Sequence, residues 1–193
     1  MKKILFWLLP LAFFSCEKTT YSPNPEDDKY TLTSMVYYME GNDRMETFVR
    51  PLHSLEYANH TGVEQRVFVD PLADIQESSL FMSDDEKAFS LLEGNAPTVA
   101  VPIALTDDGF TLGEGKWPYS NEKVLLNPSV NYRDTITVPP NTRLSLTMNV
   151  YLNEFDVSYT ALFEGSPTGA VAEIKGKWKG VAVANVEKQV EFH

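Results

Sequence analysis

Three histidines are the side chains of this 193-residue chain best suited to general acid–base or metal chemistry: His53, His60 and His193. A zinc site needs several Cys, His or carboxylate ligands at characteristic spacings, and none of these histidines has a cysteine or a second histidine at such a spacing. His60 lies in an Asn-His-Thr-Gly stretch that is typical of a turn, so a solvated loop residue is the simplest interpretation. The sequence therefore predicts no metal site and no cofactor.

Clustered carboxylates are the second set of residues with chemical potential. A pair of carboxylates can serve a glycosidase, and such oxygens can also hold Ca²⁺. The candidates are Asp84, Asp85, Asp107 and Asp108, and all lie beside Ser or Gly, where carboxylates commonly cap backbone amides. The EF-hand spacing is missing, and the Gly-Ser-Pro-Thr-Gly run at 165–169 has proline where a nucleophile elbow needs a tight turn. We expect a protein that is not an enzyme, with a hydrolase as the remaining alternative.

Aromatic side chains in loop-like sequence are the candidate ligand-binding residues: Trp117, Tyr119 and Tyr132. Exposed rings of this kind stack on sugar rings or contact a protein partner. Trp117 lies in a Gly-Lys-Trp-Pro stretch, and this loop-like context favours its exposure. Trp178 could join this exposed set. In the alternative interpretation the tryptophans belong to the core or to a sheet edge. The first interpretation predicts a glycan or a protein as the partner.

The elements that must position these side chains are β-strands. Runs rich in β-branched and aromatic residues recur about every eight to twelve residues, separated by Gly, Pro, Asn and Asp clusters. This pattern predicts an all-β fold, an elongated antiparallel β-sandwich with long strands and at most one short helix. The helix candidate is 83–92, with Ser83 as N-cap and Glu86 at the capping-box position. Strands are expected within 30–39, 44–50, 54–58, 64–70, 75–82, 98–105, 110–112, 124–126, 135–138, 173–185 and 186–192.

The most sustained alternation lies within Thr135 to Gly165. Every second residue is apolar from Leu144 to Leu152, and after Asn153-Glu154 the apolar set changes phase and runs from Phe155 to Phe163. A two-residue hairpin turn at Asn153-Glu154 and one long strand with a bulge near Asn153 explain the change equally well. Burial of eight large side chains stabilises this stretch by roughly 12–24 kcal/mol, whereas ordering about twenty residues costs roughly 20–40 kcal/mol in backbone entropy. A second apolar layer is therefore required.

The N-terminus resembles an export signal. Lys2 and Lys3 precede the apolar run Ile4–Phe14, which is shorter than the ~20 residues that a membrane-spanning helix needs. Phe13-Phe14-Ser15-Cys16 resembles the lipobox of bacterial lipoproteins, and this implies that Cys16, the only cysteine, becomes the lipidated first residue of the mature chain. An ordinary cleaved signal is the alternative. The expected organisation is a signal peptide at 1–15, a lipidated flexible tether at 16–29 and a single all-β domain at 30–193.

The expected mature chain is strongly acidic. Without Lys2 and Lys3 it holds 14 basic and 27 acidic residues, a net charge of −13. Such a field disfavours nucleic acid and anionic lipid surfaces as partners. Contact with a membrane is therefore expected through the lipid on Cys16. The expected location is the cell envelope, at the outer membrane and facing either the periplasm or the surface.

Three short motifs resemble the aerolysin-like β-pore-forming proteins, in the epsilon-toxin and mosquitocidal-toxin branch. Val138–Thr142, with the sequence VPPNT, resembles the VPPG/N-T element that precedes a long alternating strand in that family. Val157–Ala161 resembles its V-x-Y/F-T-A segment, and Asn59–Gln65 resembles its N-x-T-x-x-x-Q turn. The resemblance extends over Leu55 to Trp178. The resemblance implies an aerolysin-like β-module.

The sequence departs from this family in the segment that would enter a membrane. The resemblance implies a Ser/Thr-rich amphipathic hairpin with about 10 residues per strand. The corresponding residues, 83–127, carry Pro97, Pro102, Pro118 and acidic turns, and Pro102 would remove a backbone donor in mid-strand. We therefore expect a non-enzymatic cell-envelope lipoprotein with a binding or structural role. The alternative is a membrane-active, oligomerising β-pore-forming protein or its inactive relative.

Overall fold

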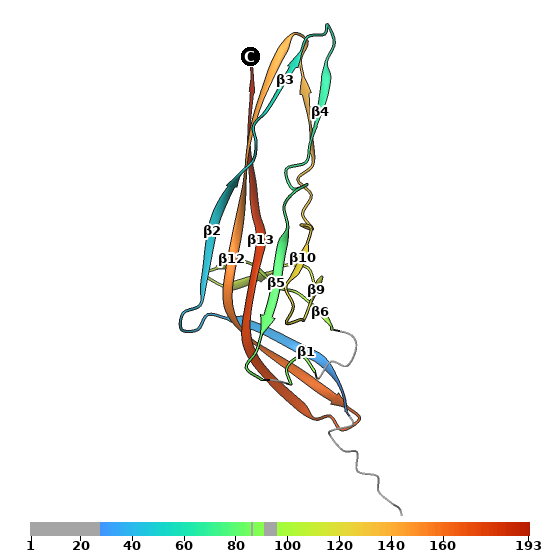
Figure 1. Ribbon diagram of the computed structural model, residues 1–193, viewed down its shortest axis with the longest axis vertical. Coiled ribbons are helices and arrows are strands. Elements are labelled where there is room, and N and C mark those ends of the chain that lie inside the picture. Colours follow the sequence, from blue (N-terminus) through green and yellow to red (C-terminus); the bar gives the residue numbers. More distant parts are fainter. Residues whose placement is uncertain (1–27, 86, 91–95) are drawn as a thin grey trace, which may run out of the picture.

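The computed structural model describes residues 28–85, 87–90 and 96–193, which form an elongated all-β molecule (Figure 1). All of its strand pairs are antiparallel, and the predicted fold class is confirmed. The described part of the chain contains no helix of the length and apolarity that a membrane span requires.

Two long strands form the spine of the molecule. β12 (Thr142–Ser166) has 25 residues and β13 (Val171–Phe192) has 22, and they pair from Leu144↔Phe192 to Glu164↔Val171. We call the end of the molecule where β12 begins the tip and the end where β12 finishes the base. The other strands of the large sheet are β1 (Lys29–Tyr38), β2 (Arg44–Pro51), β3 (Leu55–Asn59), β5 (Glu77–Met82) and β10 (Val124–Leu126). The small two-stranded sheets are made by β4 (Gln65–Val69) with β11 (Asp134–Val138), β6 (Thr98–Val99) with β9 (Trp117–Pro118), and β7 (Pro102–Thr106) with β8 (Gly109–Leu112).

Three strands follow one another along a single edge of β12, from base to tip (Figure 1). β1 pairs with the last part of β12, β2 with its middle and β3 with its beginning. In the loop between β1 and β2, the Asp43 carboxylate accepts a hydrogen bond from the backbone N–H of Ser158 at 2.7 Å. Between β2 and β3 the N–H of Leu52 donates to the carbonyl of Met148 at 2.9 Å. The edge of β12 is therefore covered almost continuously.

The buried face of β12 changes between Leu152 and Asn153, both of which are buried. Even-numbered side chains are buried toward the tip, and odd-numbered ones are buried toward the base. β2 pairs with this part of β12 without a register shift, so β12 itself gains no residue there. Since successive side chains of a strand point to opposite faces, the two halves of β12 bury opposite faces of the sheet. β4 and β11 cover one face at the tip, and Ala88, Val99, Val101, Trp117 and Tyr119 cover the other face at the base.

This geometry settles the two alternatives for the central stretch. The hairpin at Asn153-Glu154 is wrong, because β12 continues through both residues as one strand. The bulge lies in the partner strand instead of near Asn153. Tyr151 pairs with Asn185 and Leu152 with Val183, so Ala184 is the extra residue in β13. The extra residue keeps the side chains of β13 in phase with the face that β12 buries.

The base contains the largest apolar cluster, which is rich in aromatic rings. Trp178 and Tyr159 are fully buried there, and the hydroxyls of Tyr159 and Tyr119 lie 2.9 Å apart. Trp178 donates from Nε1 to the hydroxyl of Ser79 at 2.9 Å. A Cβ at Gly176 would clash with the Tyr159 ring and with the carbonyl oxygen of Met82. Only glycine, which has no Cβ, fits at this position without displacing the ring.

Several local expectations change in the structure. The helix candidate at 83–92 is described only in part, since Glu86 and 91–95 lie outside the described residues. Lys87–Ser90 form a turn, so this part is not helical. The expected strand at 98–105 is two strands interrupted at Ala100-Val101, and the two expected strands at 173–185 and 186–192 are one. The strand at Val124–Leu126 is confirmed. Cys16 and the predicted signal and tether lie outside the described residues.

Candidate functional site

A buried asparagine fastens the tip of the molecule. Asn59 is 1% exposed, and its Nδ2 lies 2.8–3.1 Å from the carbonyl oxygens of Val63, Val138 and Pro139. Its Oδ1 accepts hydrogen bonds from the N–H and the hydroxyl of Thr61, at 3.0 and 2.7 Å. One side chain thus joins the loop after β3 to the turn that leads into β12.

Two of the sequence motifs meet at this point, although they are about eighty residues apart. The first turn contributes Asn59 and Thr61, and the VPPNT turn contributes the two carbonyls. Asn141 has a φ of 55°, a left-handed conformation that asparagine tolerates better than most residues. Its N–H donates to the carbonyl of Thr61 at 3.3 Å. The motifs therefore have a structural explanation, as the two halves of one clamp.

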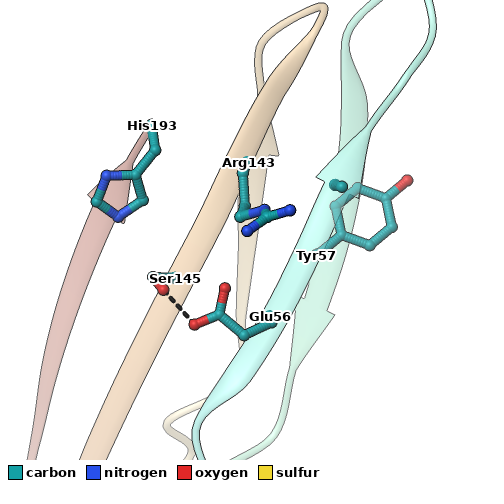
Figure 2. Close-up of a pocket in the computed structure, with 6 residues that line it drawn as sticks. Glu56, Tyr57, Arg143, Ser145 and His193 are labelled. Carbon is teal, nitrogen blue, oxygen red and sulfur yellow. Dashed lines mark hydrogen bonds between the residues drawn. The ribbon is translucent and has the colours of Figure 1, made fainter.

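An open groove lies beside this clamp, on the outer face of the sheet (Figure 2). Its volume is about 830 Å³, and three segments that are distant in sequence supply its walls. The Glu56 carboxylate on β3 accepts a hydrogen bond from the Ser145 hydroxyl on β12. The Arg143 side chain, also on β12, lies between these two strands in Figure 2. The lining residues are Glu56, Tyr57 and Ala58 of β3, Arg143 and Ser145 of β12, and His193 after β13.

The polar side chains of the groove are suited to binding a ligand. The Ser145 hydroxyl donates to a carboxylate, and His193 stands apart from it in Figure 2, so no imidazole activates this serine. His193 instead lies 3.7 Å from Glu191. A carboxylate, a hydroxyl and a guanidinium offer donors and acceptors to a polar ligand, and the guanidinium fork fits a carboxylate in two hydrogen bonds. Within 28–85, 87–90 and 96–193, no three potential metal ligands are grouped together.

The predicted aromatic residues do not contribute to this groove. Trp117 is 3% exposed and Tyr119 is 1% exposed, and both belong to the base cluster. The expectation that Trp117 is exposed is wrong, because β9 pairs with β6 and turns the ring inward, where the Lys116 ammonium lies 5.2 Å from its centroid. Tyr132 is half-buried against a third cluster, around Leu72. Trp117, Tyr119 and Trp178 are therefore core residues, as in the alternative interpretation. Ligand binding by Trp117, Tyr119 and Tyr132 stays an untested prediction.

The carboxylates considered for catalysis or Ca²⁺ are exposed turn residues. Asp85 accepts a hydrogen bond from the N–H of Lys87 at 2.8 Å, which is the backbone-capping role expected for such a position. Asp84, Asp107 and Asp108 are exposed as well. His53 and His60 are also exposed, in accord with the interpretation of His60 as a loop residue.

A buried ion pair near the middle of the molecule has no signal in the sequence. Glu77 accepts a hydrogen bond from Lys116 Nζ at 2.7 Å and another from the N–H of Val183 at 3.0 Å. The exposed fractions of the Glu77 and Lys116 side chains are 8% and 23%. Lys116 also donates to the Ser129 hydroxyl at 2.7 Å. The pair joins β5, β13 and two loops, and it borders a cavity of about 170 Å³.

Asp43 makes the stability of the β1–β2 junction sensitive to acid. Its side chain is 1% exposed, and this desolvation raises its pKa. Hydrogen bonds from Lys177, Ser158 and Glu40 outweigh the desolvation, so the pKa lies below the ordinary value of 3.8. The stabilisation is therefore complete above pH 3.8 and disappears as the pH falls through the lower pKa of the folded protein.

We expect Asp43→Asn to destabilise the protein near neutral pH and to flatten this acid dependence. Urea unfolding at pH 7 and at stepwise lower pH, for both forms, measures the difference. Asp74→Asn at an exposed position is the matched control and should leave the profile unchanged. An unchanged acid profile in Asp43→Asn would contradict the assignment.

Comparison with known proteins adds a likeness in fold. No protein family model matches the chain, and no curated protein matches it. The crystal structure of a lamprey immune protein aligns with 86% of this chain at 19% identity and a TM-score of 0.55. This chain spans 53% of that protein, about half of its length.

Two further structures align less closely. Parasporin-2, a Bacillus thuringiensis toxin that recognises cancer cells, aligns at 11% identity with a TM-score of 0.38, over 84% of this chain and 73% of its own. An aerolysin-like protein from Bombina maxima aligns at 9% identity with a TM-score of 0.34, over 86% and 97%. The chain has the all-β fold of an aerolysin-like β-module.

Proposed function

We propose that this protein is an exported, lipid-anchored binding protein of the cell envelope, without enzymatic activity, and that it binds its ligand in the groove at the tip. One observation supports this proposal above the others. Lys29, the first residue of β1, pairs with Ser166 at the base, whereas Thr142 and the groove residues lie at the other end of β12 (Figure 1). An anchor on Cys16 would leave the groove at the far end of the molecule.

The dimensions fit such a role. A strand of 25 residues is about 80 Å long at ~3.3 Å per residue. A lipid on Cys16 would place the base near the membrane and the groove well outside the headgroup layer. The spine is held along one edge by β1, β2 and β3, so the groove is presented on a stiff support.

The groove favours a polar ligand with hydroxyl groups and one carboxylate, such as an acidic glycan. Glu56 supplies acceptors, Ser145 supplies a hydroxyl, and the Arg143 fork suits a sugar carboxylate. A groove without a deep apolar pocket favours modest affinity per site. A protein surface with the same groups is the other partner that this chemistry accepts.

We expect Arg143→Ala to lower binding of acidic glycans at least tenfold, because a two-bond guanidinium–carboxylate contact is lost. A glycan array followed by titration calorimetry, on the mature chain at residues 16–193 with Cys16→Ser, measures this loss. Arg50→Ala, an exposed arginine on β2, is the control. Binding that survives Arg143→Ala but falls with Arg50→Ala would place the ligand elsewhere. Labelling with a radioactive fatty acid tests the anchor, and Cys16→Ser should lose the label.

Pore formation is the second candidate, and the aerolysin-like fold is the observation that favours it. Against it, β7 and β8 have five and four residues, about half of what a membrane-crossing strand needs. Asn153 also fastens this hairpin to the spine, donating to the carbonyl of Ile103 at 2.9 Å. Dye release from liposomes together with a heat-stable oligomer would favour the pore, and intact liposomes favour the binding protein.

A further inference from the structure

The half of β13 that lies toward the tip is a free sheet edge. From Val186 to Phe192 this strand pairs with β12 on one side, while β5 reaches only Lys177–Val181, and no other described strand lies along it. Val190 and Phe192 are 36% and 47% exposed. A free edge with apolar side chains is a template for another strand.

The backbone groups of this edge are oriented for pairing. Arg143 and His193 exchange two backbone hydrogen bonds of 2.9 Å, so the odd-numbered residues of this half direct their N–H and C=O groups toward β12. The even-numbered residues Lys188, Val190 and Phe192 therefore direct theirs outward. Their side chains lie on the inner face of the sheet, because the β12 residues opposite them are buried.

We propose that this edge binds the same edge of a second copy of the chain, in antiparallel orientation, with Val190 opposite Val190 of the other copy. Lys188 is then opposite Phe192, where the ammonium can approach the ring. Each of these opposed pairs exchanges two backbone hydrogen bonds. The exposed apolar rows of the two copies become one continuous strip on the inner face.

Charge selects this register among its neighbours. With Val190 at the symmetry axis, Gln189 is opposite Glu191 and Glu187 is opposite His193, so no like charges meet. Moving the axis toward the base, to position 189, puts Glu187 opposite Glu191, and moving it to position 188 puts Lys188 opposite Lys188. A shift toward the end of the chain puts Glu191 opposite Glu191. Like charges directly opposite each other destabilise a strand pair.

If Cys16 is the first residue of the mature chain, as the proposed function has it, the segment before the fold is too short to occupy this edge. β1 begins at the base, with Lys29 paired to Ser166. The twelve residues 16–27 span at most about 40 Å when fully extended, whereas the edge pairs with β12 between Leu144 and Val150, roughly 53–73 Å from Ser166. A second copy is therefore the occupant that this molecule itself supplies.

The antiparallel arrangement overlaps the two tips and sends the two bases in opposite directions. With a lipid anchor at each base, which rests on the proposed function, the pair would connect two facing membranes. A strand pair of this length buries little surface, so each contact is weak. Many anchored copies on two membranes would strengthen the connection through multivalency.

A single cysteine at the symmetry axis tests the pairing directly. In the mature chain with Cys16→Ser, Val190→Cys should form a disulfide-linked dimer on mild oxidation, because opposed residues of a hydrogen-bonded strand pair lie about 5.5 Å apart at Cα, within disulfide range. Val171→Cys, 70% exposed at the base, should stay monomeric. Equal dimer yields from the two variants would overturn the proposal.

Reversible association provides an independent measurement. Sedimentation of the cysteine-free chain at high concentration should show a dimer fraction that rises with salt, since salt screens the repulsion between two acidic molecules. Val190→Pro removes an outward N–H and no bond to β12, and it should abolish the dimer. Gln189→Glu, which opposes Glu191 twice without altering the backbone, should weaken it. A monomer at every concentration and salt level would reject the pairing.

Small-angle scattering of the cross-linked dimer distinguishes the orientation. The antiparallel pair should be nearly twice as long as the monomer. A dimer of unchanged length would exclude the antiparallel register. Vesicles carrying the lipidated protein should aggregate, and Val190→Pro should prevent it. If the vesicles stay separate while the soluble chain still dimerises, the connection between two membranes is rejected and the edge pairing stands.

Discussion

Glu77→Ala is expected to lower the free energy of unfolding by about 3 kcal/mol or more. The substitution leaves the Lys116 ammonium without its carboxylate and the N–H of Val183 without its acceptor. Removal of one partner from a buried pair is costly because the other charge stays in a poorly solvated place. Lys116 keeps its bond to Ser129 and some contact with solvent, which moderates the loss. Urea unfolding of both forms at pH 7 measures the difference.

Two further variants separate the charge from the hydrogen bonds. Glu77→Gln keeps an acceptor for Val183 and should cost less than Glu77→Ala. Lys116→Met combined with Glu77→Gln removes the charges while keeping the bulk, and it should recover part of the loss. Glu173→Ala breaks the exposed pair with Lys175 and is the control, with no measurable change expected. Equal effects at Glu173 and Glu77 would mean that the buried pair has no special role.

Asn59→Ala is expected to cost about 3 kcal/mol, because three carbonyl oxygens and the N–H of Thr61 lose their common partner. Asn59→Asp should be at least as damaging. It has the same shape, but it replaces the donating NH₂ by an oxygen that faces carbonyl oxygens. Thermal unfolding measures both variants.

The loss of the Asn59 clamp should also reach the groove, since Tyr57 and Ala58 directly precede it in β3. Glycan binding should therefore weaken at temperatures where the protein is still folded. Asn131→Ala, which removes one exposed turn contact to the N–H of Arg133, is the control and should change neither property. A stable Asn59→Asp variant would contradict the assigned orientation of the amide.

Local patterns predict much of the fold, as the spine illustrates. Alternation between Leu144 and Phe163 predicts long strands because side-chain direction in a strand depends only on position. The same pattern does not distinguish a turn, a bulge and a change of buried face between Leu152 and Asn153. That choice depends on which other segments cover each face. The covering segments come from residues that are far away in the sequence.

The candidate site shows the same limit. Asn59 lies in a motif that the sequence relates to an aerolysin-like module, but its five hydrogen bonds include partners about eighty residues away. The groove residues Glu56, Arg143 and His193 come from β3, β12 and the position after β13, and they have no common local signal. For Trp117 the local sequence is misleading. Its loop-like context favours an exposed ring, but β9 pairs with β6 and the ring is buried.

The sequence by itself determined the all-β class, most turn positions and the alternating spine, because these follow from backbone preferences and from the two-residue period of a strand. Only the tertiary structure decided that β12 is one strand of 25 residues, that its buried face changes at Leu152–Asn153, and that the edge of β13 is free. These features depend on which strands meet across the sheet. Strand pairing depends on the burial of apolar surface over the whole chain, and no short window of sequence contains that information.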